Sequence, residues 1–525
     1  MRFIIRQIAL PPDVPRQYAV DKASDVIRSC GARVTGASVC RVSVDSRKKN
    51  DIKLVYSVIA DCEGGADRLI KAGFEPYAEK ELTVSFGDEP VDGRIAVIGF
   101  GPAGIFAALT LAENGFAVTV CERGKNTDER AADVERLTNE GTLDPGSNVQ
   151  FGAGGAGTFS DGKLITRIND PACTYVLRQL VRFGAPEDIL INARPHIGTD
   201  LLRDVIKNAE KRLVSLGAQI RYNTKITDVK ESGRGVVLCT QGGEEYYSAA
   251  VLATGHSARD TYGMLYERGV AMEKKPFSVG CRIEHLQRDI DSAMYGEGAD
   301  KYAGYLPHAE YNLSCREGGR GVYSFCMCPG GSVICASTEP DGVVTNGMSL
   351  HARKGINANS AVAVSILPED IQGGVLSGVD FQRSIERAAF SVSRGFIAPA
   401  QTVGSFLHGK PNAIGEIAPT YRPGVVMTDL REILPRFVSS ALDTGIRYFD
   451  RKIRGFASDG AVLTAPETRT SAPVRILRDA GHVSLSVPSL YPCGEGAGYA
   501  GGITSAAADG INTALKIISR FKPNN

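Results

Sequence analysis

The sequence predicts an α/β protein in which a parallel sheet is interrupted by a mixed α+β domain and preceded by a small α+β module. Three observations support this prediction. Residues 94–123 have the pattern of strand, glycine-rich turn, helix and second strand. Residues 1–90 alternate short strands and helices of their own, and residues 489–519 return to a strand, a glycine loop and a long helix. The expected domains are 1–90, 91–274, 275–400 and 401–525, the last of which completes the interrupting domain and returns to the first sheet.

Length and charge define the broad class of the protein. A chain of 525 residues is long enough for several domains with ample cores. Sixty basic and 59 acidic side chains leave a net charge of +1, so no overall field favours nucleic acid or an anionic membrane. No secretory signal pattern opens the chain, and the 12 cysteines show neither a disulfide framework nor zinc-ligand spacing. We therefore expect a cytoplasmic, enzyme-like protein without a metal site, a membrane span or a nucleic-acid partner.

The first 90 residues predict a β-α-β-β-α-β module of the split-βαβ, ferredoxin-like type. The basic turn Asp45–Asn50 joins its second and third strands and is interpreted as a solvated hairpin, with contact to a partner or a phosphate as the alternative. Gly87–Pro90 is expected to be the linker to the next domain. The strands are predicted at 3–8, 33–44, 52–60 and 82–86, and the helices at 14–30 and 66–72.

The glycine-rich turn after the strand 95–98 has the spacing G-x-G-x-x-G, formed by Gly99, Gly101 and Gly104. In a nucleotide-binding fold the first glycine permits the tight turn, the second lets the backbone approach a pyrophosphate, and the third lets the helix pack on the sheet. Glu122 ends the second strand and is placed to bind an adenosine ribose, which favours FAD or NAD over NADP.

The same region also contains an uncharged run of the minimum length for a membrane helix, 95–112. Glycines and a proline crowd its first half, and the order strand, turn, helix, strand and glutamate favours the nucleotide-binding interpretation.

The elements that follow continue the same alternation. The glycine-dense stretch 141–167 mixes apolar and polar residues, which favours an ordered loop against a ligand over a flexible linker. Residues 275–400 are glycine-rich and strand-like and are expected to form a cap over the substrate. The other predicted elements are helices at 125–140, 199–216 and 505–518 and strands at 220–223, 226–230, 248–253 and 490–492.

Three segments together resemble the FAD-dependent oxidoreductases, the superfamily of p-hydroxybenzoate hydroxylase, the fumarate reductase flavoproteins and glutathione reductase. They are 94–123, the strand ending at Gly255, and Tyr491–Gly498, in which Glu495 stands where the family more often has Asp. The resemblance implies a Rossmann-type FAD-binding domain interrupted by a mixed α+β cap domain. More narrowly, the chain resembles a bacterial family of uncharacterised "NAD(FAD)-utilising" dehydrogenases in the motifs GGAGTFSDGKL (154–164), RPHIGTD (194–200), FCMCPGG (325–331), ETRTSAPVRILR (467–478) and GEGAGYAGGITSAAADG (494–510).

The resemblance implies FAD as cofactor and assigns residues to each part of it. The helix that begins near Thr504 would point its positive end at the flavin and stabilise a reduced, anionic ring. The implied contacts are Gly99, Gly101, Ala103 and Gly104 for the pyrophosphate, Glu122, Arg123 and Ile226 for the adenosine, Gly157, Thr158, Ser160 and Lys163 for the flavin side, Gly255 over the cofactor, and Gly494, Glu495, Gly502 and Ile503 for the ribityl chain and pyrimidine edge.

Cys326 and Cys328 form a C-x-C pair with two possible roles. They could be redox-active thiols that work with the flavin, or buried packing residues on one face of a regular strand through 322–327, which we favour.

Two further side chains are candidates for chemistry. His196 could act as a general acid or base, or as a structural histidine, which we favour. Arg469, together with Arg475, could clamp a substrate carboxylate or pair with Glu467 and Asp479.

The function expected from these features is FAD-dependent oxidoreduction of a small-molecule substrate in a cleft under the cap, with hydride passing through flavin N5. No second strand–G-x-G-x-x-G–helix unit follows, so NAD(P)H would dock only transiently. The alternatives are a flavoprotein that acts on a macromolecule such as tRNA through the 45–50 turn, and a non-catalytic flavin-binding protein.

Overall fold

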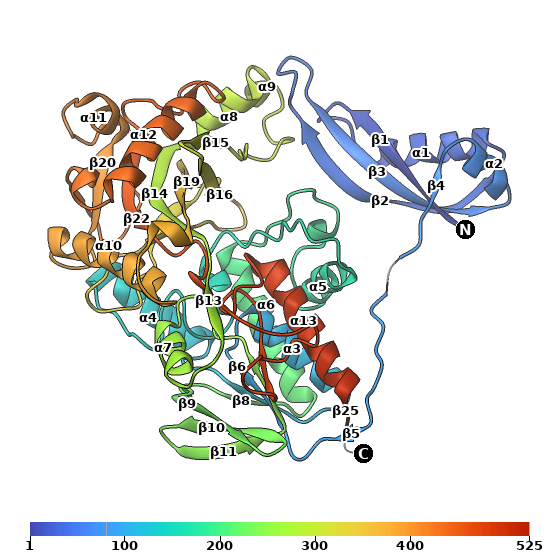
Figure 1. The fold of residues 1–525 in the computed structure, drawn as a ribbon. Helices are drawn as coiled ribbons and strands as arrows, with labels where there is room; N and C mark the ends of the chain where they lie inside the picture. The colour runs from blue at the N-terminus through green and yellow to red at the C-terminus, as the bar shows by residue number, and fades with distance from the viewer. Residues whose placement is uncertain (80, 524–525) are drawn as a thin grey trace.

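The computed structural model describes residues 1–79 and 81–523, and three main sheets organise the chain (Figure 1). A four-stranded sheet forms the N-terminal module, a five-stranded parallel sheet forms the centre, and a seven-stranded sheet forms the cap. In Figure 1 the N-terminal module lies to one side, and β5 (Glu89–Pro90), which follows it in the chain, lies next to the C-terminus. Mixed α/β architecture is thereby confirmed.

The N-terminal sheet has the order β2-β3-β1-β4 with antiparallel neighbours. The helix α1 buries Ala19, Ala23 and Ile27 against the sheet, because its apolar residues recur on one face. The predicted fourth strand at 82–86 was wrong. Helix α2 ends at Lys71, Gly73 follows with φ +88°, and Glu75 and Pro76 already pair with β1, so the fourth strand forms there. The elements are β1 (Arg2–Leu10), α1 (Gln17–Ser29), β2 (Arg33–Asp45), β3 (Lys53–Glu63), α2 (Ala66–Lys71) and β4 (Glu75–Pro76).

The two segments expected to be solvated or free are held by the rest of the protein. In the 45–50 turn, Arg47 is exposed and pairs with Asp45, whereas Lys49 donates to the carbonyl oxygen of Ala293 at 2.6 Å. The predicted linker forms β5, which pairs in parallel with β25 (Phe521–Lys522). The module therefore contacts the rest of the protein through Lys49, and the segment that follows the module is held in place by the pairing of β5 with β25.

The central sheet has the order β24-β12-β6-β7-β8, and all its strands are parallel. All its strands are short, and all but the partly exposed edge strand β8 are buried on both faces, as expected for a parallel sheet covered by helices. They are β6 (Ile95–Ile98), β7 (Val118–Cys121), β8 (Gln219–Arg221), β12 (Ala249–Leu252) and β24 (Leu490–Pro492).

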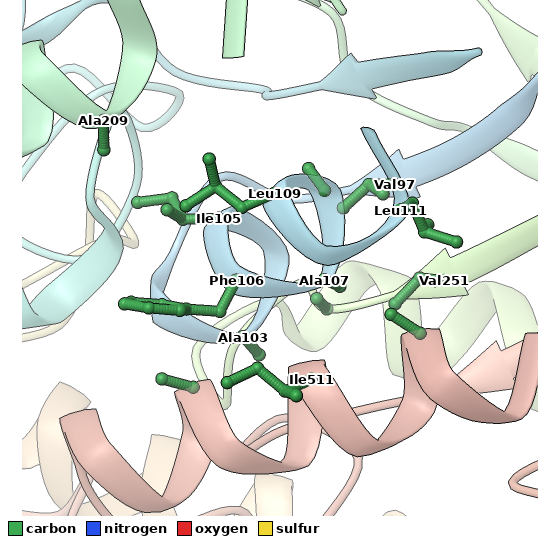
Figure 2. Packing of buried hydrophobic residues seen from close by; sticks show 14 of the residues in the cluster. Val97, Ala103, Ile105, Phe106, Ala107, Leu109, Leu111, Ala209, Val251 and Ile511 are labelled. Carbon is green, nitrogen blue, oxygen red and sulfur yellow. The ribbon is translucent and has the colours of Figure 1, made fainter. Parts of the chain in front are cut away.

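Helices α3 (Pro102–Glu113) and α13 (Ile503–Arg520) pack closely together (Figure 2). Ala103 and Ala107 of α3 face Ile511 of α13. Gly510 permits the approach, because a Cβ there would lie 2.2 Å from the Ala103 carbonyl oxygen. The uncharged run 95–112 is thus a core strand and helix, and no helix among the described residues is long and apolar enough to cross a membrane.

The strand predicted at 226–230 belongs to a separate antiparallel unit. This unit has the order β11-β10-β9 and stands between β8 and β12 in the chain. Its strands are β9 (Asp228–Ser232), β10 (Gly235–Thr240) and β11 (Gly243–Tyr247). Around the central sheet lie the helices α4 (Thr127–Glu140), α5 (Pro171–Arg182), α6 (Thr199–Ser215) and α7 (Arg259–Glu267).

The cap is a sheet of order β15-β16-β19-β14-β22-β20-β21 that extends to Glu467. Strands β14 and β19 are buried along nearly their whole length, and α12 packs Leu442, Ile446 and Phe449 against the same core. The strands are β14 (Phe277–Leu286), β15 (Ser314–Glu317), β16 (Arg320–Cys328), β19 (Asn357–Ile366), β20 (Ala398–Thr402), β21 (Val425–Met427) and β22 (Val462–Glu467). The other elements of this half are β13 (Met272–Lys274), α8 (Gln287–Tyr295), α9 (Gly298–Lys301), β17 (Ser332–Cys335), β18 (Thr345–Met348), α10 (Ser377–Ser393), α11 (Val403–His408), α12 (Arg436–Asp450) and β23 (Val474–Ile476).

Candidate functional site

A cavity of about 320 Å³ lies at the carboxyl ends of the central strands. The ends of β6, β7 and β12 form one part of its wall, and the glycine-rich segments near residues 155 and 501 form another. The cap closes it with Phe325, Cys326 and Asn346. The connections from β6 and β12 leave the sheet in opposite directions at this point, which is where open α/β sheets bind their ligands.

The three glycines of the first turn have different roles. Gly99 has φ +101°, and a Cβ there would lie 2.4 Å from the Ala253 carbonyl oxygen. A Cβ on Gly104 would lie 2.0 Å from the Gly99 carbonyl oxygen. A Cβ on Gly101 would instead meet only Gly155 Cα, at 3.7 Å. Gly99 and Gly104 are therefore required for packing, whereas Gly101 keeps the cavity wall free of a side chain.

Two helix N-termini face the cavity. Helix α3 begins with Pro102 after Gly101, α13 begins with Ile503 after Gly502, and no side chain caps either helix. The first backbone N–H groups of a helix lack intrahelical partners and carry partial positive charge. Both ends are thus available to an anionic or polar ligand in the cavity.

The carboxylate of Glu122 connects the glycine-rich turns. It accepts hydrogen bonds from the backbone N–H groups of Phe100 at 2.7 Å, and of Gly124 and Gly152 at 2.9 Å each. Next to it, the guanidinium of Arg123 lies 4.4 Å from the centre of the Phe151 ring and pairs with Asp260 at 3.0 Å. Both side chains line the cavity at the end of β7, where an adenosine was predicted.

Lys163 places a buried ammonium at the cavity wall. Its Nζ lies 3.1 Å from Asp161 and 3.0 Å from Glu310, and Arg353 pairs with both carboxylates. Burial lowers the pKa of Lys163, but the two carboxylates outweigh burial and hold that pKa above its usual value. Lys163 is therefore protonated and positively charged at neutral pH.

His196 lies behind this cluster and does not line the cavity. Its Nε2 is 3.1 Å from the His351 carbonyl oxygen, and the two imidazole rings stack with centres 5.4 Å apart. Burial, followed by the charge of Arg353, lowers the pKa of His196. The residue is thus a neutral, hydrogen-bonded neighbour of the Lys163 cluster.

The prediction that both cysteine sulfurs lie on one face of a regular strand was wrong. Strand β16 has a bulge between Phe325 and Cys328, where it has one residue more than β19 opposite. Cys326 has φ +46° and lines the cavity, whereas Cys328 is buried behind the cavity wall. The bulge separates the two environments.

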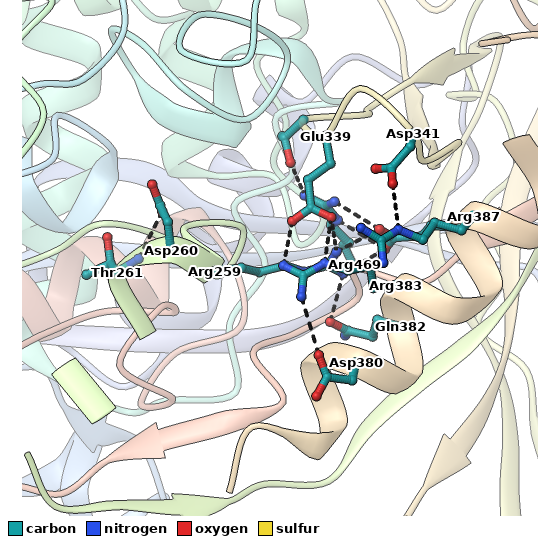
Figure 3. Close-up of polar contacts among 12 residues, drawn as sticks. Arg259, Asp260, Thr261, Glu339, Asp341, Asp380, Gln382, Arg383, Arg387 and Arg469 are labelled. Carbon is teal, nitrogen blue, oxygen red and sulfur yellow. Dashed lines mark hydrogen bonds and ion pairs between the residues drawn. The ribbon is translucent and has the colours of Figure 1, made fainter. Parts of the chain in front are cut away.

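Arg469 lines the cavity, but its charge is paired inside the protein (Figure 3). It donates to both oxygens of Glu386, at 3.2 and 3.0 Å, and to Thr338. Arg259 of α7 binds the same carboxylate at 2.7 Å. Neither Glu467 nor Asp479, the partners predicted, takes part. The network joins α7 beside the central sheet to α10 of the cap.

Burial raises the pKa of Glu386, but Arg469 and Arg259 outweigh burial and hold that pKa at about 2. The other arginine predicted with Arg469, Arg475, pairs with Glu273 at 3.3 Å.

Most of the predicted cofactor residues line the cavity: Gly99, Gly101, Ala103, Glu122, Arg123, Gly157, Ser160, Lys163, Ile226, Gly255, Glu495, Gly502 and Ile503. Three do not. Gly104 packs under the turn, the Thr158 hydroxyl donates to Ala153, and the Gly494 N–H donates to Asp509 at 2.7 Å.

The sequence prediction missed several lining residues, among them Gln150, Thr224 and Asn346. Gln150 directly precedes the glycine-rich loop, so its position was a usable signal. Asn346 lies on the β17–β18 hairpin of the cap and has no local signal, because only the tertiary fold brings it to the cavity.

These residues fit a dinucleotide. A glycine without a side chain faces the cavity beside one uncapped helix, a second uncapped helix lies further along the wall, and an acid ends β7. This set matches the needs of a pyrophosphate, a polar ring edge and a ribose, respectively.

Comparison with known proteins agrees with this fit. Residues 276–470 match the family described as "FAD-dependent protein, C-terminal domain-like". An uncharacterized protein of Clostridium beijerinckii is 45% identical over 499 residues, which cover 93% of each chain.

Among solved structures, CtdE in complex with FAD is 12% identical over 82% of this chain and 83% of its own, with a TM-score of 0.32. The halogenase PltM in complex with phloroglucinol and FAD is 10% identical over 81% and 68%, with a TM-score of 0.36. Likeness at this level carries no conclusion about this chain. The family match and the Clostridium relative do: the chain belongs to one family with the Clostridium beijerinckii protein, has the C-terminal domain of the FAD-dependent proteins and uses FAD as its cofactor.

Proposed function

We propose that the protein is an oxidoreductase of the NAD(FAD)-utilising dehydrogenase type, which transfers hydride to or from a small-molecule substrate. The observation that carries this proposal is that one cavity joins the nucleotide-binding turns to the cap. Phe325, Cys326 and Asn346 of the cap line the same space as Gly101 and Gly502. When bound, the flavin supplies hydride exchange at N5. A substrate enclosed by the cap would meet the cofactor there.

The chain's own residues favour negative charge in this part of the cavity. The N-terminus of α13 directs partial positive charge at the wall formed by Gly502 and Ile503. The ammonium of Lys163 adds a full charge, held in place by Asp161 and Glu310. Charge that develops on a cofactor during reduction would be stabilised by such preorganised groups. This arrangement supports reduction rather than simple storage of the flavin.

The number of nucleotide-binding sheets bears on how an electron donor such as NADH or NADPH binds. In the described part of the chain, the parallel nucleotide-binding sheet is a single one, β24-β12-β6-β7-β8. A dinucleotide that already occupies it leaves no second fold of this kind for NAD(P)H. We therefore propose that NADH or NADPH docks transiently over the flavin end of the cavity.

Anaerobic titration with NADH and with NADPH tests the proposed function. The purified protein is expected to show the yellow flavin spectrum, and at least one of the two nucleotides is expected to bleach it. Dithionite, which reduces flavin without a binding site, provides the control. If dithionite bleaches the flavin and neither nucleotide does so over hours, the proposal that the protein is a dehydrogenase using NADH or NADPH is wrong.

The charge on Lys163 is expected to raise the reduction potential of the bound flavin. Lys163→Met removes that charge and leaves Asp161 and Glu310 to Arg353. A nearby charge in a partly buried site contributes on the order of 1.4 kcal/mol or more, so the potential should fall by about 30 mV or more. Equilibrium titration against a reference dye measures this potential. Lys207→Met, which removes a lysine paired with Asp128 at the surface, is the matched control and should leave the potential unchanged.

A further inference from the structure

Two cysteines in the cap stand at the cavity in an arrangement that packing alone does not explain. Cys326 lines the cavity, and its φ of +46° is a conformation that residues other than glycine rarely adopt. Strained backbone of this kind persists where the surrounding structure holds it in place, and it is concentrated at functional sites. An ordinary apolar residue on a regular strand would fill the same volume without the bulge.

Behind Cys326, Cys328 is completely buried, and both sulfurs are free thiols. The Cys328 Sγ–H points back towards Cys326 and lies 3.3 Å from the Cys326 carbonyl oxygen. The Cys328 thiol therefore contacts the Cys326 backbone directly, and of the two residues Cys326 lines the cavity.

A buried arginine supports the pair. Arg282 donates to the Cys326 carbonyl oxygen at 2.9 Å, and its Nη2 lies 3.7 Å from the Cys328 sulfur. Its charge is balanced by Glu467 at 3.3 Å. Burying a guanidinium at this position has a desolvation cost in free energy, and two cysteines that only fill space would not require a charged neighbour.

The protons of the pair are distributed unevenly. The neighbouring Cys328 thiol, followed by the charges of Arg282 and Lys163, lowers the pKa of the Cys326 thiol. The neighbouring Cys326 thiol, together with burial, raises the pKa of Cys328. The sulfur that carries thiolate character is thus the one that faces the cofactor cavity, and thiolate is the reactive form.

We propose that Cys326 and Cys328 form a dithiol–disulfide couple that exchanges two electrons with the bound flavin. The inference rests on the proposed oxidoreductase function and adds a second redox centre to the same site. In the oxidising direction both S–H bonds break and one S–S bond forms. The two electrons and one proton go to the oxidised flavin, and the second proton is released to solvent. In the reverse direction the S–S bond is reduced to two thiols.

Anaerobic reductive titration of the air-oxidised holoprotein with dithionite tests this couple. The wild-type protein is expected to take up two electrons per flavin more than the Cys328→Ser variant, because the variant cannot form the disulfide. Cys335→Ser is the matched control: Cys335 is also buried, lies on β17 outside the cavity wall and should leave the electron count unchanged. Equal electron uptake by the wild-type protein and Cys328→Ser would overturn the proposal.

A second measurement uses only the wild-type protein, so it does not depend on how well a variant folds. The tryptic peptide 321–353 contains Cys326, Cys328 and Cys335. After oxidation and alkylation without reductant, only one of the three cysteines should carry an alkyl group. The mass of this peptide should be about 2 Da lower than that of the same peptide with one alkyl group and two free thiols, because the disulfide lacks two hydrogens. Three alkylated cysteines in that peptide would overturn the proposal.

Neither measurement requires NADH, NADPH or a substrate. Extra electrons and a disulfide in a protein that no pyridine nucleotide reduces would support the couple and disprove the proposed donor. Flavin bleaching by NADH, with no extra electrons and no disulfide, would support the proposed donor and disprove the dithiol–disulfide couple.

Discussion

Gly101→Ala is expected to give a folded protein that no longer retains FAD. Gly101 has φ −83° and an extended ψ, which alanine adopts freely, and a methyl group there would meet only Gly155 Cα at 3.7 Å. Inside the protein the substitution is therefore tolerated. The methyl group would occupy the wall of the cavity at the start of α3, where the pyrophosphate needs close approach to the backbone. FAD affinity should fall by about 100-fold, or about 2.7 kcal/mol.

The measurement is the ratio of flavin to protein after purification, followed by titration of the apoprotein with FAD, with circular dichroism to verify the fold. Gly263→Ala is the control, because Gly263 lies on α7 and a Cβ there has no neighbour within 4 Å. That variant should keep its flavin. Gly99→Ala should behave differently from both and fail to fold, since its Cβ would lie 2.4 Å from the Ala253 carbonyl oxygen. A yellow Gly101→Ala protein with full occupancy would contradict the proposed pyrophosphate position.

Glu386→Gln is expected to destabilise the protein by about 3–5 kcal/mol. The Glu386 carboxylate is fully buried and balances Arg259 and Arg469, which are themselves almost fully buried. Gln keeps the size of the side chain but leaves the buried Arg469 without its counter-charge and Arg259 with Glu339 alone, at 3.3 Å, and this kind of loss is among the most costly in protein interiors. The network connects α7 to α10, so the junction between the central sheet and the cap should open first. The effect is measured by thermal unfolding, with flavin release and circular dichroism recorded as the two signals.

A surface pair in the same region provides the comparison (Figure 3). Asp341 and Arg387 lie 2.7 Å apart, but their side chains are 48% and 54% exposed. Exposed ion pairs contribute less than about 1 kcal/mol, so Asp341→Asn should change the unfolding temperature little. Similar losses from both variants would show that the buried carboxylate has no special role.

The effect of Glu386 is also expected to depend on pH. In the folded protein its pKa is about 2, compared with the usual 4.5. A lowered carboxyl pKa stabilises the folded state fully above about pH 4.5, and this contribution is lost as the pH falls from 4.5 towards 2. The difference in stability between the wild-type protein and Glu386→Gln should therefore shrink over that interval. A constant difference between pH 7 and pH 3 would exclude the carboxylate as its source.

The nucleotide-binding half could be predicted from the sequence because its signals are local. Short apolar strands, glycines at fixed spacing and an acid after β7 are contiguous in the chain, and the five-stranded sheet places them as the pattern indicates. Boundaries were less predictable. The extended, apolar stretch at 82–86 has the composition of a strand, but the edge of β1 is already taken by Glu75–Pro76.

The cysteine pair shows how far periodicity can be used. Alternation along 322–327 predicts two sulfurs on one face, and a single extra residue in β16 relative to β19 changes that result. A bulge depends on the register of two strands more than 30 residues apart, which neither segment encodes alone.

The sequence by itself therefore determined the dinucleotide-binding α/β fold, because strand, turn and helix signals act between neighbouring residues. Its resemblance to the FAD-dependent oxidoreductases added FAD as the cofactor. Only the tertiary structure decided which charges meet at the site. Glu310 pairs with Lys163, and Glu386 pairs with Arg469, across separations of more than 80 residues. Such pairs are selected by burial and the need to balance charge in the folded chain, and no local pattern records that need.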